Sequence, residues 1–130
     1  MSVRTVEIPP ADWSRALNEF SAIHEGWLVS LDILSPTIGA QPEIIDLPLV
    51  GVTFEPGDGG TMTVTAAPSA DDHITHAIRS PARVWIERTD AGADVALEIE
   101  SADSTKAILR FKTAALPETV DGVERPQRPS

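Results

Sequence analysis

Two histidines three residues apart, His73 and His76, have the types and spacing closest to those of a metal site in this chain. Asp71 and Asp72 directly precede them and add carboxylate oxygens. On a helical turn, residues at i and i+3 face the same way, so both imidazoles could bind one divalent ion. Such a site needs a third protein ligand, which His24 or one of the aspartates would have to supply. The alternative is a loop-to-helix turn in which an aspartate caps the helix and one imidazole bonds to the backbone.

A hydrolytic set can be assembled from the same stretch, with Ser69 or Ser80 as the nucleophile beside a histidine and an aspartate. No Gly-x-Ser-x-Gly elbow surrounds either serine, and nothing marks one of them as activated. The stretch 58–60, Asp-Gly-Gly, is not a phosphate loop, because no Gly-Lys-Ser/Thr follows it. The sequence therefore predicts no catalytic residue and no cofactor other than a divalent metal at the two histidines, and it favours a protein that is not an enzyme.

A tryptophan among arginines, Trp85, is the candidate for an interaction patch. If Val84 and Ile86 point inward on a strand, Trp85 and Arg83 point outward, and Arg79 lies close by in the sequence. Exposed tryptophan and arginine are enriched where proteins bind one another. The alternative is a sheet covered on both faces, with Trp85 packed under the helix or the C-terminal tail.

The elements that would position these residues follow from hydrophobic periodicity. Residues 10–25 show the apolar spacing of one helix face, and Gly26 stands where a left-handed C-terminal cap is expected. Alternating or apolar runs predict strands at 27–34, 47–55, 61–67, 83–88, 95–100 and 106–112, with a short strand or lead-in at 43–46 and an extended segment at 1–8. Residues 35–42, with two prolines and a glycine, predict a connection. The stretch 69–78 predicts a short helical turn, because Ser69 or Asp71 could cap it and Ile74 and Ile78 are four apart.

These elements predict an α+β fold in a single domain over residues 1–113. An N-terminal amphipathic helix would pack on a curled antiparallel sheet or small barrel of five to six strands, with the short helical turn between strands three and four. The residues 114–130 carry mixed charge and several prolines without an apolar face, which predicts a disordered tail. The predicted core comprises Trp13, Leu17, Phe20, Trp27, Val29, Leu31, Val52, Phe54, Val64, Ile74, Val84, Ile86, Leu97, Ile99, Leu109 and Phe111.

Composition limits the partners. The 130 residues carry a formal net charge of −10, which opposes binding to phosphate backbones and anionic lipid. The chain has no cysteine, so a disulfide framework or a thiolate zinc site is ruled out. No stretch reaches membrane-spanning length, and residues 1–7 lack the apolar core of a signal peptide. We therefore expect a soluble, cytoplasmic protein that binds neither nucleic acid nor membrane.

The chain carries five short stretches in this order: 13–20, 24–27 (His-Glu-Gly-Trp), 47–52 (Leu-Pro-Leu-Val-Gly-Val), 72–74 (Asp-His-Ile) and 80–84 (Ser-Pro-Ala-Arg-Val). In these stretches and in the order of its elements, it resembles an uncharacterised bacterial family of small α+β domains of unknown function. The resemblance covers roughly residues 8–112 and implies no activity and no functional residue.

Two functions follow from these observations. The first is a non-catalytic domain that works by contact with a protein partner or with further copies of itself, through Trp85, Arg83 and Arg79. The second is a small metal-binding or ligand-binding protein that uses His73 and His76.

Overall fold

The described part of the polypeptide folds into one open antiparallel sheet with a single α-helix. The computed structural model describes residues 3–69 and 71–112. Eight strands are formed by these residues: β1 (Val3–Ile8), β2 (Leu28–Ser35), β3 (Gly39–Glu55), β4 (Thr61–Ser69), β5 (Asp72–Arg79), β6 (Pro81–Thr89), β7 (Asp94–Ser101) and β8 (Lys106–Phe111). A 3-10 turn, η1 (Pro10–Asp12), leads into the helix α1 (Trp13–His24). The strand order in the sheet is β1-β6-β7-β8-β2-β3-β4-β5.

The predicted fold class is wrong in two respects. The chain is mostly strand rather than α+β, and the sheet in the described residues has eight strands where five to six were expected. The predicted helical turn at 69–78 does not form, because this stretch is β5, which pairs with β4 in continuous antiparallel register from Arg79 to Ile74. The capping residues and the two isoleucines satisfy a helical spacing, but cross-strand pairing outweighs that local signal. The predicted tail, 114–130, lies outside the described residues.

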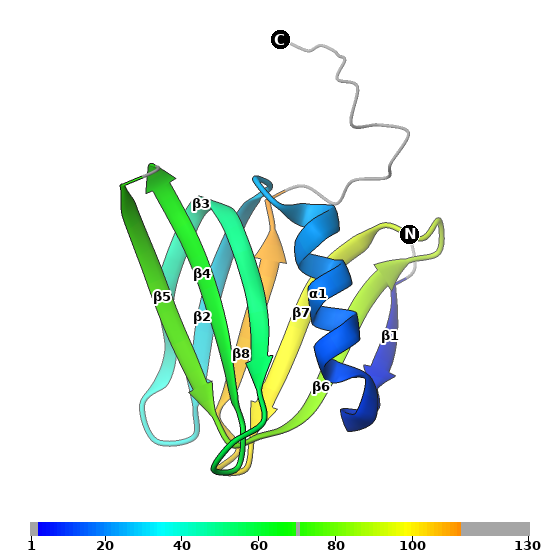
Figure 1. The fold of residues 1–130 in the computed structure, drawn as a ribbon, viewed down its shortest axis with the longest axis vertical. Helices are drawn as coiled ribbons and strands as arrows, with labels where there is room; N and C mark the ends of the chain where they lie inside the picture. The colour runs from blue at the N-terminus through cyan, green and yellow to red at the C-terminus, as the bar shows by residue number, and fades with distance from the viewer. Residues whose placement is uncertain (1–2, 70, 113–130) are drawn as a thin grey trace, which may run out of the picture.

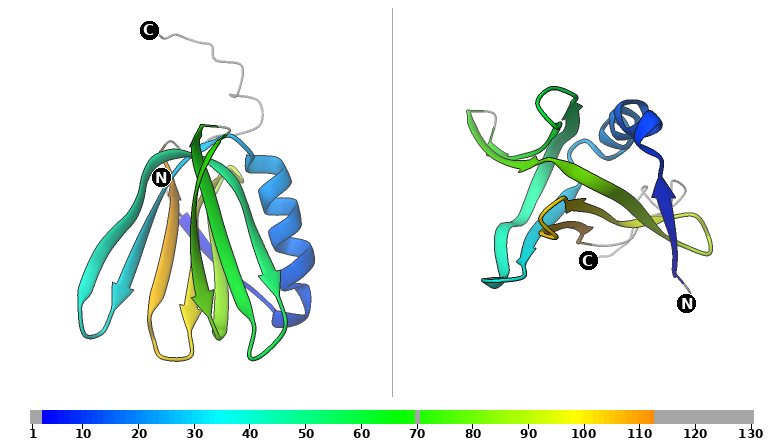
Figure 2. Two further views of the ribbon diagram at one scale, coloured as in Figure 1. Left: turned by 60° about the vertical axis from the view of Figure 1, so that its left-hand side comes forward. Right: turned by 90° about the horizontal axis from the view of Figure 1, so that it is seen from below.

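The sheet folds over on itself at β3, and this makes two layers. The first layer contains β1, β6, β7, β8, β2 and the first half of β3, and the second contains the last part of β3 with β4 and β5. Figure 2 shows the two layers from the end, with α1 beside the second layer at the side where β1 ends the first. The strand β3 can take part in both layers because its register shifts near Asp46, whose φ is +50°.

The strand β3 is longer than the sequence predicts. It begins at Gly39 and includes Pro42, which lies opposite Asp32 of β2. Proline is tolerated in a strand where the missing N–H faces an unpaired edge, and β4 pairs with β3 only from Leu49 onward. The predicted connection at 35–42 therefore shrinks to residues 36–38.

The helix α1 lies along the edge of β3 in its second half, where β2 no longer pairs with this strand. The Ser21 hydroxyl accepts a hydrogen bond from the Val52 backbone N–H at 2.8 Å, and its hydrogen lies within reach of the Val52 and Leu17 carbonyl oxygens at 2.9 and 2.8 Å. One side chain thus satisfies the strand edge that β2 no longer covers.

The core lies between the two layers and the inner face of α1 (Figure 1). The predicted helix at 10–25 is confirmed, since η1 and α1 cover it and Gly26 has the left-handed φ of +87° that follows a helix end. Thirteen of the predicted core residues are buried, while Trp27 and Phe54 pack against the core with part of their surface exposed. The prediction that Ile74 belongs to the core is wrong, because this residue lies on the edge strand β5 with 38% of its surface exposed.

We predict that Ser21→Ala lowers the free energy of unfolding by about 1–3 kcal/mol, because the Val52 N–H and C=O then lack a partner in a partly buried position. Chemical denaturation at neutral pH measures this loss. The control is Ser14→Ala on the exposed face of the same helix, for which a change within about 0.5 kcal/mol is expected. Equal effects of the two substitutions would contradict the role of Ser21 as the partner of the β3 edge.

Candidate functional site

A buried histidine at the end of α1, His24, is the first unusual feature of the molecule. Its side chain is 2% exposed. The imidazole lies among three aromatic rings, with centroid distances of 4.5 Å to Phe20, 4.6 Å to Trp27 and 4.5 Å to Phe111. A polar ring in such surroundings needs hydrogen-bond partners for both nitrogens.

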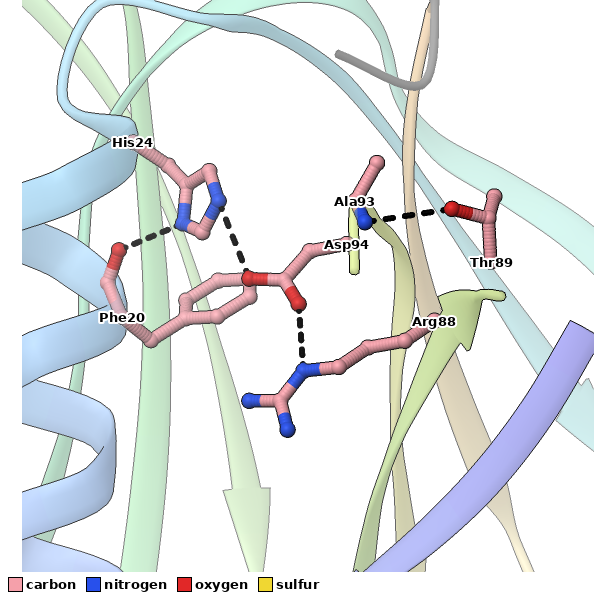
Figure 3. Close-up of polar contacts among 6 residues, drawn as sticks. All are labelled: Phe20, His24, Arg88, Thr89, Ala93 and Asp94. Atoms are coloured by element: carbon pink, nitrogen blue, oxygen red, sulfur yellow. Dashed lines mark hydrogen bonds and ion pairs between the residues drawn. The ribbon is translucent and has the colours of Figure 1, made fainter. Parts of the chain in front are cut away.

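Both ring nitrogens of His24 face oxygen acceptors (Figure 3). Nδ1 lies 2.7 Å from the Phe20 carbonyl oxygen, and Nε2 lies 3.2 Å from Oδ2 of Asp94 at the start of β7. A carbonyl and a carboxylate can only accept, so this geometry fits the imidazolium, with a hydrogen on each nitrogen. The second oxygen of Asp94 accepts a 2.8 Å hydrogen bond from Nε of Arg88 on β6. We call these three residues the His24 network.

Asp94 is held ionised by this network. Burial raises the pKa of Asp94, but hydrogen bonds from His24 and Arg88, together with their positive charges, outweigh burial and lower the pKa below its ordinary value of 3.8. The network ties the C-terminal turn of α1 to the β6–β7 reversal. With both ring nitrogens engaged and the ring buried, His24 has no lone pair to offer a substrate or a metal. His24 therefore has a structural role.

A cleft opens beside the network, between α1 and β1. Its volume is about 270 Å³, and Asp94 and Arg88 lie at one end of it. The apolar part of the lining includes Val6 and Ile23, whose surfaces are 38% and 62% exposed. The full lining is Val6, Glu7, Ile8, Pro9, Asp12, Arg15, Ala16, Glu19, Phe20, Ile23, Ile86, Arg88 and Asp94. We call this hollow the α1–β1 cleft.

The charges that line the α1–β1 cleft are paired. Of its four carboxylates, Glu7 lies 2.9 Å from Arg83, and Asp94 contacts Arg88 and His24, which leaves Asp12 and Glu19 beside Arg15. Arg15 lies 3.4 Å from Asp12 and 3.5 Å from Glu19, and these side chains are 45–63% exposed. Exposed pairs of this kind contribute little to stability, so their charges are free to respond to a ligand.

The structure does not bring His73 and His76 together. Both lie on β5, where residues an odd number apart point to opposite faces, so the helical geometry that would join two imidazoles on one ion is absent. Among the described residues, no group of three or more His, Cys, Asp and Glu side chains is arranged to hold a metal ion. His76 lines a separate hollow of about 240 Å³ between β5 and the β7–β8 turn, without His73.

Trp85 lies on the outer face of the first layer, opposite to the helix. It is half-buried, since the Arg83 guanidinium lies 4.8 Å and the Lys106 ammonium 6.0 Å from its ring centroid. Arg83 also donates two hydrogen bonds to Glu7, at 2.9 and 3.2 Å, which lower the pKa of Glu7. Arg79 is not part of this face, because it is at the end of β5 opposite Thr61. The predicted patch is thus split between two layers, and neither α1 nor any other described helix covers Trp85.

Two carboxylates meet on the same outer face. Glu98 lies directly across from Trp85, and Glu87 is its diagonal neighbour on β6. A hydrogen bond shared with Glu87, partial burial and the negative charge of Glu87 raise the pKa of Glu98, against the opposing effect of Lys106 and Arg110.

Sequence reasoning missed the His24 network and the α1–β1 cleft. A signal for the first was present, since Leu17, Phe20 and His24 follow the apolar spacing of α1, and a histidine on that stripe must be buried with partners. No local signal identifies Asp94 and Arg88 as those partners, because the contacts depend on how the β6–β7 reversal meets the helix end.

The described residues define a mainly β protein, with one α-helix packed on a folded-over antiparallel sheet and a cleft at the edge of the helix. No described helix is both long and apolar enough to cross a membrane. Residues 4–119 match the model of a family of unknown function (DUF5335), and the chain belongs to this family. It is 30% identical to an uncharacterised protein of the bacterium Aquifex aeolicus (strain VF5) over 115 residues, which cover 88% of this chain and 98% of that protein. No solved structure matches the chain.

We predict that Asp94→Asn destabilises the fold by roughly 1–3 kcal/mol at pH 6, because it removes a charged acceptor of two hydrogen bonds. A carboxyl whose pKa is lowered by folding stabilises the folded state above its unfolded pKa and loses that contribution as pH falls through the folded pKa. The difference between wild type and variant should therefore shrink below pH 3.8. Urea titrations across pH 3–6 measure it, with Asp90→Asn in the adjacent turn as the control, because it removes a carboxyl outside the His24 network. A difference that stays constant with pH would contradict the role of the Asp94 charge.

We predict that Glu98→Gln, in contrast to Asp94→Asn, stabilises the fold at neutral pH. A carboxyl whose pKa is raised by folding stabilises the folded state below its unfolded pKa, and this contribution is lost as pH rises through the folded pKa. At neutral pH the ionised Glu98 of the wild type therefore destabilises the folded state. The variant should be more stable by about 0.2–1 kcal/mol at pH 7 and should lose this advantage below pH 4.5. Thermal and urea unfolding measure the change. Glu100→Gln is the matched control, because Glu100 lies between Arg83 and Lys106 and its removal should bring no gain.

Proposed function

We propose that this protein is a non-catalytic protein-binding domain whose partner docks in the α1–β1 cleft. The observation that carries the proposal is the position of Ile23 on the rim of the cleft, 62% exposed, beside Val6 at 38%. Apolar side chains that stay exposed next to a hollow are typical of a protein interaction site.

The outer face around Trp85 is less suited to the docking of a protein partner. Arg83 is paired with Glu7 at 2.9 Å, and Arg110 with Asp32 at 2.8 Å. A partner on this face would have to break these pairs and displace the cations from the Trp85 ring. These pairs are about as exposed as those of Arg15 in the cleft, so the difference between the two faces lies in the bare apolar side chains of Val6 and Ile23.

The charge and composition of the chain support a cytoplasmic setting and a protein partner. The net charge of −10 disfavours nucleic acid and anionic lipid, and the absence of cysteine is compatible with a reducing compartment. Metal binding at His73 and His76 is not the function we favour, because the two side chains point to opposite faces of β5.

We predict that a photoreactive amino acid at position 23 crosslinks to one reproducible protein in native cells, because the Ile23 side chain would lie in the interface. Ile38 is the matched control, since it is 68% exposed in the turn between β2 and β3, away from the cleft. Mass spectrometry of the two sets of adducts makes the comparison. The same products from both positions, or none from position 23, would contradict the proposal.

A further inference from the structure

We infer that the hollow beside His76, between β5 and the β7–β8 turn, binds a small neutral polyol through its hydroxyl groups. We call this hollow of about 240 Å³ the His76 hollow. Its lining residues differ from those of the α1–β1 cleft, so the inference goes beyond the proposed function. The end of β5 and the β7–β8 turn lie at the same end of the molecule (Figures 1 and 2).

A buried hydroxyl without a partner marks the His76 hollow as a binding site. Ser101 ends β7 with 8% of its surface exposed, and it follows Leu97 and Ile99 on the inner face of that strand. Its backbone N–H and C=O are both bonded within the β7–β8 turn, at 2.8 and 3.0 Å. Its hydroxyl has no hydrogen-bond partner among the described residues. A buried polar group is costly unless something bonds to it, so this hydroxyl requires a water molecule or a ligand.

The imidazole of His76 borders the same hollow from the second layer. It lies between Ile74 and Ile78 on the inner face of β5, half-buried and opposite the buried Val64 of β4. Within the described part of the chain, its ring forms no hydrogen bond or ion pair. A neutral imidazole offers one donor and one acceptor, and a hydroxyl offers both at one atom. Each layer therefore contributes a group that can both donate and accept.

The apolar part of the lining favours a short aliphatic skeleton. Ile33, Ile78 and Ala107 border the His76 hollow where it meets the core. Carbon atoms of a ligand against these side chains would gain from leaving water. The volume is below that of a site for a drug-sized molecule, so the ligand has to be small.

The charges around the hollow favour a neutral ligand. Asp103 accepts a 3.0 Å hydrogen bond from the Thr105 N–H, and hydrogen bonds from Thr105 lower the pKa of Asp103, so this carboxylate is ionised and repels an anion. A cation gains little from it, because it is exposed and already bonded. Arg79 follows Ile78 on β5, so its side chain points to the outer face. A charge in the hollow would thus lack a partner, whereas hydroxyl groups would find two.

The test uses the full chain and three probes that share one skeleton: neopentyl glycol, pivalate and neopentylammonium. A titration followed by amide chemical shifts should show saturable binding of the glycol in the millimolar range, as expected for a ligand of this size. The shifts should centre on residues 76, 78, 101, 105 and 107 and leave residues 4–8 and 23 unchanged. Pivalate and neopentylammonium should bind about tenfold more weakly or worse.

Variants of the chain locate the contact. Ser101→Ala should weaken binding of the glycol about tenfold, and the unfolding midpoint should not fall, because the hydroxyl loses no internal partner. His76→Phe should weaken binding at least as much, because it removes the imidazole and fills the hollow. His73→Phe is the matched control, since it makes the same change on the opposite, exposed face of β5 and should leave binding unchanged.

Several results would overturn the inference. They are no saturable shifts up to about 0.1 M glycol, equal affinity for a charged probe, shifts confined to other surfaces, or equal effects of the two phenylalanine variants. A lower unfolding midpoint for Ser101→Ala would show that the hydroxyl is bonded within the fold and would also reject the site. None of these results bears on the α1–β1 cleft, which the crosslink from position 23 tests.

Discussion

The structure depends on how the edge of β3 is shared between a strand and a helix. The first half of this 17-residue strand pairs with β2, and further along the same edge the backbone of Val52 is bound by the Ser21 hydroxyl. A sheet edge left without partners inside the fold would carry unsatisfied polar groups. Because α1 fills that place, the sheet can fold over without losing its backbone bonds, and the helix becomes the border of the second layer.

The position of α1 is set at both ends by polar contacts to the first layer. Near its start, Trp13 donates to the Ile8 carbonyl, and at its end His24 donates to Asp94, which Arg88 also holds. Both contacts are buried or nearly so, where hydrogen bonds are strong and costly to break. The helix is therefore fixed at a distance from β1 rather than packed flat against it, and a cleft is left between them. Binding to a site that is already formed loses less conformational entropy.

The sequence predicted those parts of the fold that have a local cause. The helix at 10–25 follows from the spacing of Trp13, Leu17 and Phe20, and the strands of the first layer follow from alternation. The local sequence of β5 does not decide between helix and strand, because its isoleucines fit a helical spacing. Its pairing with β4 makes it a strand, and that pairing is seen only in the fold. The same limit applies to the site. His73 and His76 are close in sequence and separated on the strand, whereas His24 and Asp94 are seventy residues apart and in contact.

The acidity of the chain gives the open edge of β1 a consistent physical role. An edge strand with exposed valines, such as Val3 and Val6, is a site at which a sheet can extend into another copy of the same protein. Two copies meeting there would bring together two chains of formal net charge −10, and salt weakens that repulsion by screening it. The net charge of the chain therefore opposes extension of the sheet from one copy to the next at β1.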